Sequence, residues 1–128
     1  MSASEALQLA VINALKGNAA LSEVTDGEIS QNAPDSFSYP YVTLGPSSFH
    51  SENADGLTAR EETLQVDCWS QRGGSLAETK RMVDLAYSAL HEADLALAEP
   101  YTASGAEVVL ARSFVDRDQV TGHGVLQI

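Results

Sequence analysis

The sequence predicts an α+β domain in which two main helices pack on an antiparallel or mixed sheet of about four strands. A chain of 128 residues has the length of one domain, so we expect residues 1–128 to form a single unit. Two segments repeat apolar residues at helical spacing, and four others have strand patterns separated by turns. Their order is helix, strand, strand, helix, strand, strand, which is typical of an α+β layer fold.

The first helix is expected to begin at Ser2, because Ser2 and Glu5 have the spacing of a capping box. Gly17 stands where a left-handed residue would end this helix, and residues 18–23 predict a short further helical turn. Asp26-Gly27 is a turn signal. The helix has one apolar stripe, formed by Leu7, Ala10, Val11, Ala14 and Leu15.

Two strands are expected in the middle of the chain. The first covers residues 41–45, directly after Pro40. The second covers residues 62–70 and is the clearest strand in the sequence. A long, exposed, acid-rich loop at about residues 46–60 would join them, and loops of this length in small domains are usually functional or mobile. In the second strand Leu64, Val66 and Cys68 face one way, and Gln65, Asp67 and Trp69 face the other.

The second main helix is expected to open with a capping box at Ser75 and Glu78 and to end near His91. A terminal hairpin should follow, with strands at residues 107–116 and 124–128. The apolar stripe of this helix is Leu76, Thr79, Val83, Ala86, Tyr87 and Leu90.

The charge balance excludes several classes of partner. Seven Lys and Arg residues stand against 18 Asp and Glu residues, which gives a net charge of −11, and Lys16 is the only basic residue before Arg60. Without a cationic cluster the chain is not expected to grip nucleic acid or an anionic membrane surface. A single cysteine fits a reducing compartment, and the first residues lack the basic start of a signal peptide, so we expect synthesis in the cytoplasm.

The chemical candidates are weak. Asp116, Asp118 and His123 could form an oxygen-rich cation site, or the two carboxylates could lie at a solvated hairpin tip. Cys68 alternates with apolar residues, which favours a buried, inert thiol over a nucleophile. His50 and His91 are too far apart in sequence to match a local metal or catalytic spacing. The sequence therefore predicts no catalytic residue, no cofactor and no metal.

Trp69 is the residue that a solvated surface does not explain, because it shares a strand face with Gln65 and Asp67. Two explanations remain open: a helix covers that face as well, or another subunit does. The loop of residues 47–60 is similarly interpreted as a docking arm, or as an insertion without a role.

The whole pattern resembles a known family, the tail terminator (tail completion) proteins of long-tailed bacteriophages and of phage-like gene transfer agents. The resemblance spans nearly the full chain and depends on the order and spacing of its segments. These are the N-terminal helix, Tyr39-Pro40-Tyr41-Val42-Thr43-Leu44-Gly45, Leu64-Gln65-Val66-Asp67-Cys68-Trp69-Ser70, the helix ending Ala89-Leu90-His91, and Gly122-His123-Gly124-Val125-Leu126-Gln127-Ile128.

The resemblance implies a structural protein rather than an enzyme. Members of the family are expected to form a homohexameric ring at the head-proximal end of the tail tube, in the neck of the particle. The ring ends tube polymerisation and joins the tail to a head-side stopper protein, while DNA passes through the lumen as cargo. Trp69 and Gln65, with Phe49, His50, Glu52 and Asp55 of the loop, are the expected interface residues.

Two other classes of function stay open at this point. The first is a small monomeric adaptor or binding module, which would share the acidic surface. The second is a metal-dependent enzyme that uses Asp116, Asp118 and His123.

Overall fold

The computed structural model describes residues 2–34, 36–51, 60–103 and 105–127. The elements in chain order are α1 (Ala3–Lys16), α2 (Ala19–Thr25), β1 (Ile29–Ser30), β2 (Tyr41–Ser51), β3 (Arg60–Gln71), α3 (Ala77–Leu90), β4 (Leu110–Val115) and β5 (Thr121–Gln127). The predicted α+β class is confirmed. β1 was not predicted, because two residues are too short to show a periodicity.

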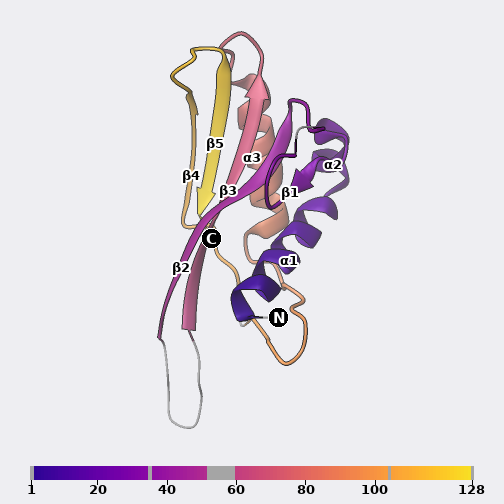
Figure 1. Ribbon diagram of the computed structural model, residues 1–128, viewed down its shortest axis with the longest axis vertical. Coiled ribbons are helices and arrows are strands. Elements are labelled where there is room, and N and C mark those ends of the chain that lie inside the picture. The colour runs from indigo at the N-terminus through magenta and orange to yellow at the C-terminus, as the bar shows by residue number, and fades with distance from the viewer. Residues whose placement is uncertain (1, 35, 52–59, 104, 128) are drawn as a thin grey trace.

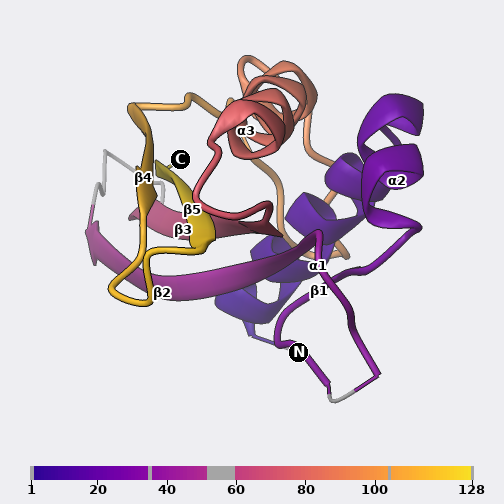
Figure 2. The same cartoon turned by 90° about the horizontal axis from the view of Figure 1, so that it is seen from above.

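The strands form one mixed sheet in the order β1-β2-β3-β5-β4 (Figure 1). β1 runs parallel to β2, and the other neighbours are antiparallel. The three helices lie on one side of this sheet, as the view from above shows (Figure 2). We call that side the helix-covered face and the opposite side the outer face.

The helix-covered face holds the core. Val42 of β2 and Leu64, Val66 and Cys68 of β3 are buried on this face, as the alternation in the sequence predicted for β3, and Leu44 is partly buried beside them. The buried members of the cluster include Val11, Leu15, Leu21, Ile29, Val42, Leu64, Val66, Cys68, Met82, Ala86 and Leu90.

The ends of α1 and α2 confirm most of the predicted caps. The capping box of Ser2 and Glu5 is formed, and the side-chain oxygen of Asn18 accepts a hydrogen bond from the Leu21 amide at 2.9 Å. The left-handed end predicted at Gly17 is wrong, since its φ is −69° and its amide donates to the Asn13 carbonyl. The left-handed residue is Asp26, with φ 54°, at the end of α2.

The second predicted capping box is also wrong. Leu76 is the N-cap of α3, and no side chain caps it. The Glu78 carboxylate is drawn instead to Arg72, at 3.1 Å, and to the Ser70 hydroxyl, at 2.6 Å. Burial opposes the ionisation of Glu78, but the hydrogen bonds from Arg72 and Ser70 outweigh it, so the pKa of Glu78 lies below its usual value.

The buried stripe of α3 differs from the prediction at two positions. Tyr87 is 41% exposed, whereas Met82, which the prediction missed, is fully buried. Val83 and Thr79 face β5 at two glycines, Gly122 and Gly124, where an added Cβ would lie well inside contact distance of the helix side chains. Helix and strand therefore approach more closely than any larger residue on β5 would allow.

β2 is longer than predicted. It was expected to stop at Gly45, but it continues to Ser51 after a register shift between Leu44 and Ser47. The predicted loop of residues 46–60 is therefore strand up to Ser51, and its residues 52–59 lie outside the described residues. A bulge explains the misinterpretation, since the extra residue breaks the alternation on which strand prediction depends.

β2 and β3 continue together beyond the other strands at one end of the sheet (Figure 1). We call residues 47–51 and 60–64 the arm. The terminal hairpin is confirmed as β4 and β5, although β5 begins at Thr121 rather than Gly124. None of the described helices is long and apolar enough to cross a membrane.

Candidate assembly surface

The outer face carries a row of ring-bearing side chains that runs across four strands. Tyr41 of β2 pairs with Trp69 of β3, Trp69 pairs with His123 of β5, and His123 pairs with Phe114 of β4. The distances between successive ring centroids are 6.4, 3.9 and 4.8 Å. We call these four residues the aromatic row. The sequence pointed to Trp69 alone, because the other three join it only through the strand register.

Trp69 is the centre of the row. Its ring stacks on His123 with an interplanar angle of 16°, and its Nε1 donates to the Thr43 hydroxyl at 3.0 Å. The first explanation for Trp69, a helix over its face, does not hold, since the three described helices lie on the opposite side (Figure 2). The indole is satisfied at its polar end while part of its ring stays accessible, as in many interface tryptophans.

A buried carboxylate lies beside the row. Asp67 is 6% exposed, and its Oδ1 lies 2.8 Å from His123 Nε2 and accepts from Gln65 Nε2 at 2.9 Å. A Cβ at Gly45 would lie 2.7 Å from Asp67 Oδ2, so glycine leaves the room that the carboxylate needs. The other ring nitrogen of His123 lies 3.7 Å from Asp116. These contacts fix the imidazole beneath Trp69.

The candidate cation site is not formed. Both oxygens of Asp118 are used within the hairpin turn: Oδ1 accepts from the amides of Val120 and Thr121 at 3.0 and 2.8 Å, and Oδ2 accepts from the Thr121 hydroxyl. Hydrogen bonds, first from Thr121, lower the pKa of Asp118. No three metal-ligating side chains come together in the described part of the chain. The alternative interpretation, a hairpin tip, describes Asp118.

The inert-thiol prediction for Cys68 is confirmed. The side chain is fully buried, and this burial raises the pKa of the thiol to about 12. A nucleophilic cysteine needs the opposite shift. Burial, together with a hydrogen bond to Tyr39, likewise raises the pKa of Tyr41 in the row to about 12.

The arm presents a second group of predicted interface residues. Phe49 is 56% exposed, and the Arg60 guanidinium lies 3.8 Å from the centre of its ring. Arg60 also contacts the Glu62 carboxylate and the Ser4 hydroxyl, each at 2.9 Å, which ties the arm to the start of α1. His50 lies 3.8 Å from Glu61. The structure thus separates Phe49 and His50 from Trp69 and Gln65.

Two of the predicted interface residues, Glu52 and Asp55, lie outside the described residues. The sequence signal for the arm was the run of small and polar residues, which was interpreted as a loop. The register shift between Leu44 and Ser47 breaks the alternation, so no local pattern indicates the strand pairing of residues 47–51 with 60–64.

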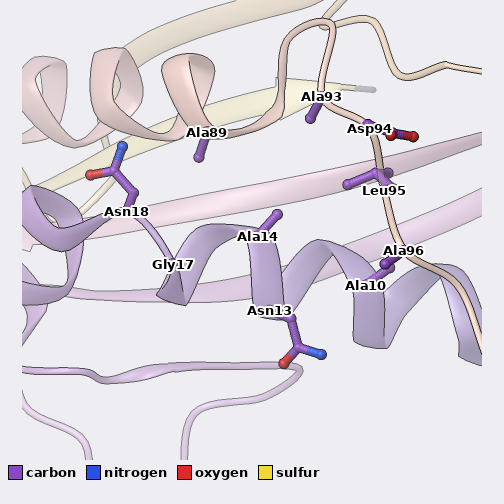
Figure 3. A pocket seen from close by; sticks show the side chains of 10 residues that line it. All are labelled: Ala10, Asn13, Ala14, Gly17, Asn18, Ala89, Ala93, Asp94, Leu95 and Ala96. Atoms are coloured by element: carbon purple, nitrogen blue, oxygen red, sulfur yellow. The ribbon is translucent and has the colours of Figure 1, made fainter.

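The described pockets offer little chemistry. One, of about 520 Å³, lies between α1 and residues 89–96 and is lined mainly by alanines, with Asn13, Asn18 and Asp94 as its polar members (Figure 3). Another, of about 730 Å³, has Glu61, Glu62, Glu92 and Glu107 at its lining. Neither set of lining residues contains a cysteine or a histidine.

Comparison with known proteins identifies the family. Residues 9–128 match the family model described as tail completion protein gp17. The chain belongs to this family. It is 27% identical over 126 residues to the tail completion protein gp17 of Bacillus phage SPP1. The alignment covers 98% of this chain and 91% of that protein.

Two solved structures are similar in fold. The structure of bacteriophage SPP1 gp17 superimposes with a TM-score of 0.64 at 26% identity, over 98% of this chain and 87% of that one. A chain of the virion of a native gene transfer agent particle superimposes with a TM-score of 0.89, over 98% of this chain and 93% of that one. At 20% identity the second match shows the fold alone.

These matches confirm the predicted family. The chain is a tail completion protein, which is a structural protein and not an enzyme. The metal-dependent enzyme is therefore no longer needed to explain the chain. Membership in the tail completion family implies contacts with other structural proteins of the tail.

Proposed function

We propose that the protein forms a homohexameric ring at the head-proximal end of the tail tube. The ring ends tube polymerisation and offers its other side to the head-side stopper protein, while DNA passes through the lumen. The protein is made in the bacterial cytoplasm and assembles into the neck of the particle. Membership in the tail completion family supports this role.

The observation that carries the proposal is the uncovered aromatic row on the outer face. Rings that lie next to each other across four strands form an apolar strip, and such strips are enriched at protein interfaces. A closed ring requires a heterologous interface, in which one patch meets a different patch on the neighbour. Trp69 and Gln65 belong to the first patch. The second is the arm, with Phe49 and His50, and with Glu52 and Asp55 next to it in sequence.

The charge of the chain supports the passage of DNA. At −11 and without a cationic cluster in its sequence, six copies around a channel would repel phosphate rather than hold it. A channel that bound DNA would slow its ejection. The acidic balance is therefore an advantage for a protein through which DNA must move.

Two measurements test the proposal. Native mass spectrometry over a concentration series, with negative-stain imaging of the heaviest species, is expected to find a six-fold ring. The second measurement covers a ring that forms only on the end of the tube. Tails that lack this protein are purified and incubated with the purified protein. Added protein should stop tube elongation and appear as density at one end. Tubes that continue to grow in saturating protein would overturn the proposed function.

A further inference from the structure

We infer that β4 of one copy pairs, as an added antiparallel strand, with the free edge of the arm of the next copy, so that the sheet continues from subunit to subunit. The partner is a second copy of this chain, and the inference rests on the proposed ring. Backbone hydrogen bonds between two open edges would form the contact.

β4 is the last strand of the sheet, and no described strand pairs with its outward edge. The Asp116 amide donates to the Thr121 carbonyl at 2.8 Å, so alternate residues of β4 direct their backbone groups toward β5. The residues between them, Ala111, Ser113 and Val115, direct theirs outward. No described strand uses these amides and carbonyls, so they can pair with a strand of another copy.

The edge of β4 lacks the usual protection. Exposed edges are normally blocked by lysine, proline or a bulge, but Arg112 is the only charged residue of β4 and the strand has no proline. Leu110 is 44% exposed and Val115 37%, and Val109 just before the strand is 64% exposed. An apolar edge left open in this way is suited to pairing with a partner strand.

A second open edge lies at the other end of the sheet. β1 pairs only with Val42 and Thr43 of β2, so the remainder of β2 has no described neighbour on that side. The Val42 amide donates outward, to the Glu28 carbonyl. Leu44 pairs with Val66 and Ser47 pairs with Leu64, and Val66 and Leu64 have the same orientation because they are two residues apart on β3. Ser47 therefore has the same orientation as Leu44, despite the bulge between them. Ser47, Phe49 and Ser51 therefore direct their backbone groups outward.

The directions of the two edges match. β2 runs opposite to β3, β3 opposite to β5, and β5 opposite to β4, so β4 is antiparallel to β2. Rotation about a ring axis preserves the direction of each strand relative to that axis. β4 of one copy would thus meet β2 of the next in antiparallel orientation, which continues the existing pattern.

The offset between the edges also fits a closed ring. Through the register, Ser113 is level with Cys68 and Val42, whereas the arm begins about five residues farther along β2, roughly 17 Å at ~3.4 Å per residue. Four strands span about 19 Å at ~4.8 Å per strand. A step of this size requires the strands to tilt by roughly 40°, within the ~35–45° that closed sheets adopt.

The charges of the two edges are complementary. Arg112 lies on the outer face of β4, and Glu61 lies on the outer face of the arm, where it is exposed. With β4 paired to the arm, the guanidinium of one copy and the carboxylate of the next would lie on the same side of the joined sheet. This favours β4 against the arm over contacts between two arms.

Ala111→Pro tests the edge directly. Proline removes an outward amide, and edge strands tolerate it at such positions because the fold does not use that amide. Ala111→Ser keeps the amide and is the matched control. We expect the protein concentration that half-assembles the ring to rise at least about tenfold in Ala111→Pro and to stay unchanged in Ala111→Ser. Val115→Lys places a lysine on the same edge and replaces Ala111→Pro if that variant does not fold.

Rings of Ala111→Pro or folded Val115→Lys that assemble at the wild-type concentration would overturn the inference and leave the proposed ring intact. If the wild type neither assembles nor caps tubes, the proposed function itself fails. The two failures are therefore distinguishable.

Cross-linking gives a second, independent readout. Ser113→Cys protein is mixed with Ser47→Cys or Phe49→Cys protein under mild oxidation. Disulfide dimers should form in the mixtures and not in either variant alone, because the contact joins two different edges. The native Cys68 is buried and inert and does not interfere. Equal cross-linking of Ser113→Cys with itself would indicate a two-fold contact and would contradict the inference.

Discussion

The two faces of the sheet use their side chains in different ways. On the helix-covered face, two glycines of β5 let α3 approach, and the residues that meet there are buried. On the outer face, Trp69 and its neighbours contact each other across the strands, yet no described helix covers them. The helix-covered face is covered by elements of the same copy, whereas the outer face leaves aromatic side chains partly accessible.

Stability and assembly should depend on different faces of the sheet. A change on the helix-covered face should destabilise the monomer, because the side chains there are closely packed. A change on the outer face should cost the monomer less and the assembly more. Each of the following experiments measures unfolding and assembly on the same variant, so that the separation itself is tested.

The largest loss of stability is expected from Gly124→Ala. The new methyl group would meet Val83, whose β-branched side chain has one strongly preferred rotamer in a helix and cannot turn aside. Overpacking of this kind lowers the free energy of unfolding by about 1–3 kcal/mol. Urea denaturation measures it. Gly105→Ala is the control, since its added Cβ would meet nothing within 4 Å.

Relief of the clash provides the decisive check on that prediction. Val83→Ala in the Gly124→Ala background should recover part of the lost stability, although the same change alone creates a cavity and destabilises the protein. Additive losses in the double variant would show that the two residues do not press on each other.

Trp69→Ala should affect assembly more than folding. The indole is half-buried, and removing its stack on His123 and its hydrogen bond to Thr43 should lower the free energy of unfolding by about 1–2 kcal/mol. Native mass spectrometry should find that ring formation is lost at concentrations where the wild type assembles. Tyr87→Ala removes an exposed aromatic from α3, where it stacks on His91, and serves as the matched control.

An equal loss of thermal stability in monomer and assembly would count against an interface role. Trp69 would then be a side chain that stabilises the sheet of one copy, and the aromatic row would lose its place in the proposed function.

The helix-covered face was predictable from sequence because its signals are periodic. Leu64, Val66 and Cys68 alternate along one strand, and the stripe of α1 repeats at helical spacing. The capping box predicted at Ser75 and Glu78 failed locally, because the Glu78 carboxylate contacts Arg72 and the Ser70 hydroxyl instead of capping the helix.

The outer face was predictable only in part, because it depends on register. Tyr41, His123 and Phe114 lie far from Trp69 in sequence, and no local pattern states that these strands align. The arm was hidden for a related reason, since a bulge near Gly45 shifts the alternation and makes a strand read as a loop. Long-range pairing is information that a single sequence carries weakly.

High pH should test the burial of one group on each face, Cys68 on the helix-covered face and Tyr41 on the outer face. Burial raises the pKa of Cys68 to about 12 from 9.0, and mainly burial raises that of Tyr41 to about 12 from 10.0. Each group is harder to ionise when folded, so its contribution is complete below the unfolded pKa and is lost as the pH rises toward 12. The free energy of unfolding should therefore begin to fall above pH 9.

Cys68→Ala separates the two contributions. In this variant the decline should begin nearer pH 10, because Tyr41 alone remains. A thiol reagent at pH 8 should label Cys68 in urea and not in buffer. Rapid labelling of the folded protein would contradict the burial that the two-face comparison assumes.

The smallest effect on folding is expected from Phe49→Ala. The ring is 56% exposed, and its contact with Arg60 is worth about 0.5–1 kcal/mol at an accessible site, so thermal unfolding should shift little. Assembly is the readout that distinguishes the arm from an ordinary surface. If the arm contacts the neighbouring copy, the Phe49→Ala protein should need a higher protein concentration to form the oligomeric ring. Leu9→Ala, which removes an apolar side chain that is 45% exposed on α1, should assemble as the wild type does. If Phe49→Ala assembles at the same protein concentration as Leu9→Ala, the side chains of the arm do not contribute to the interface and the aromatic row does. Pairing of β4 with the edge of β2 would not be affected, because strand pairing uses backbone groups.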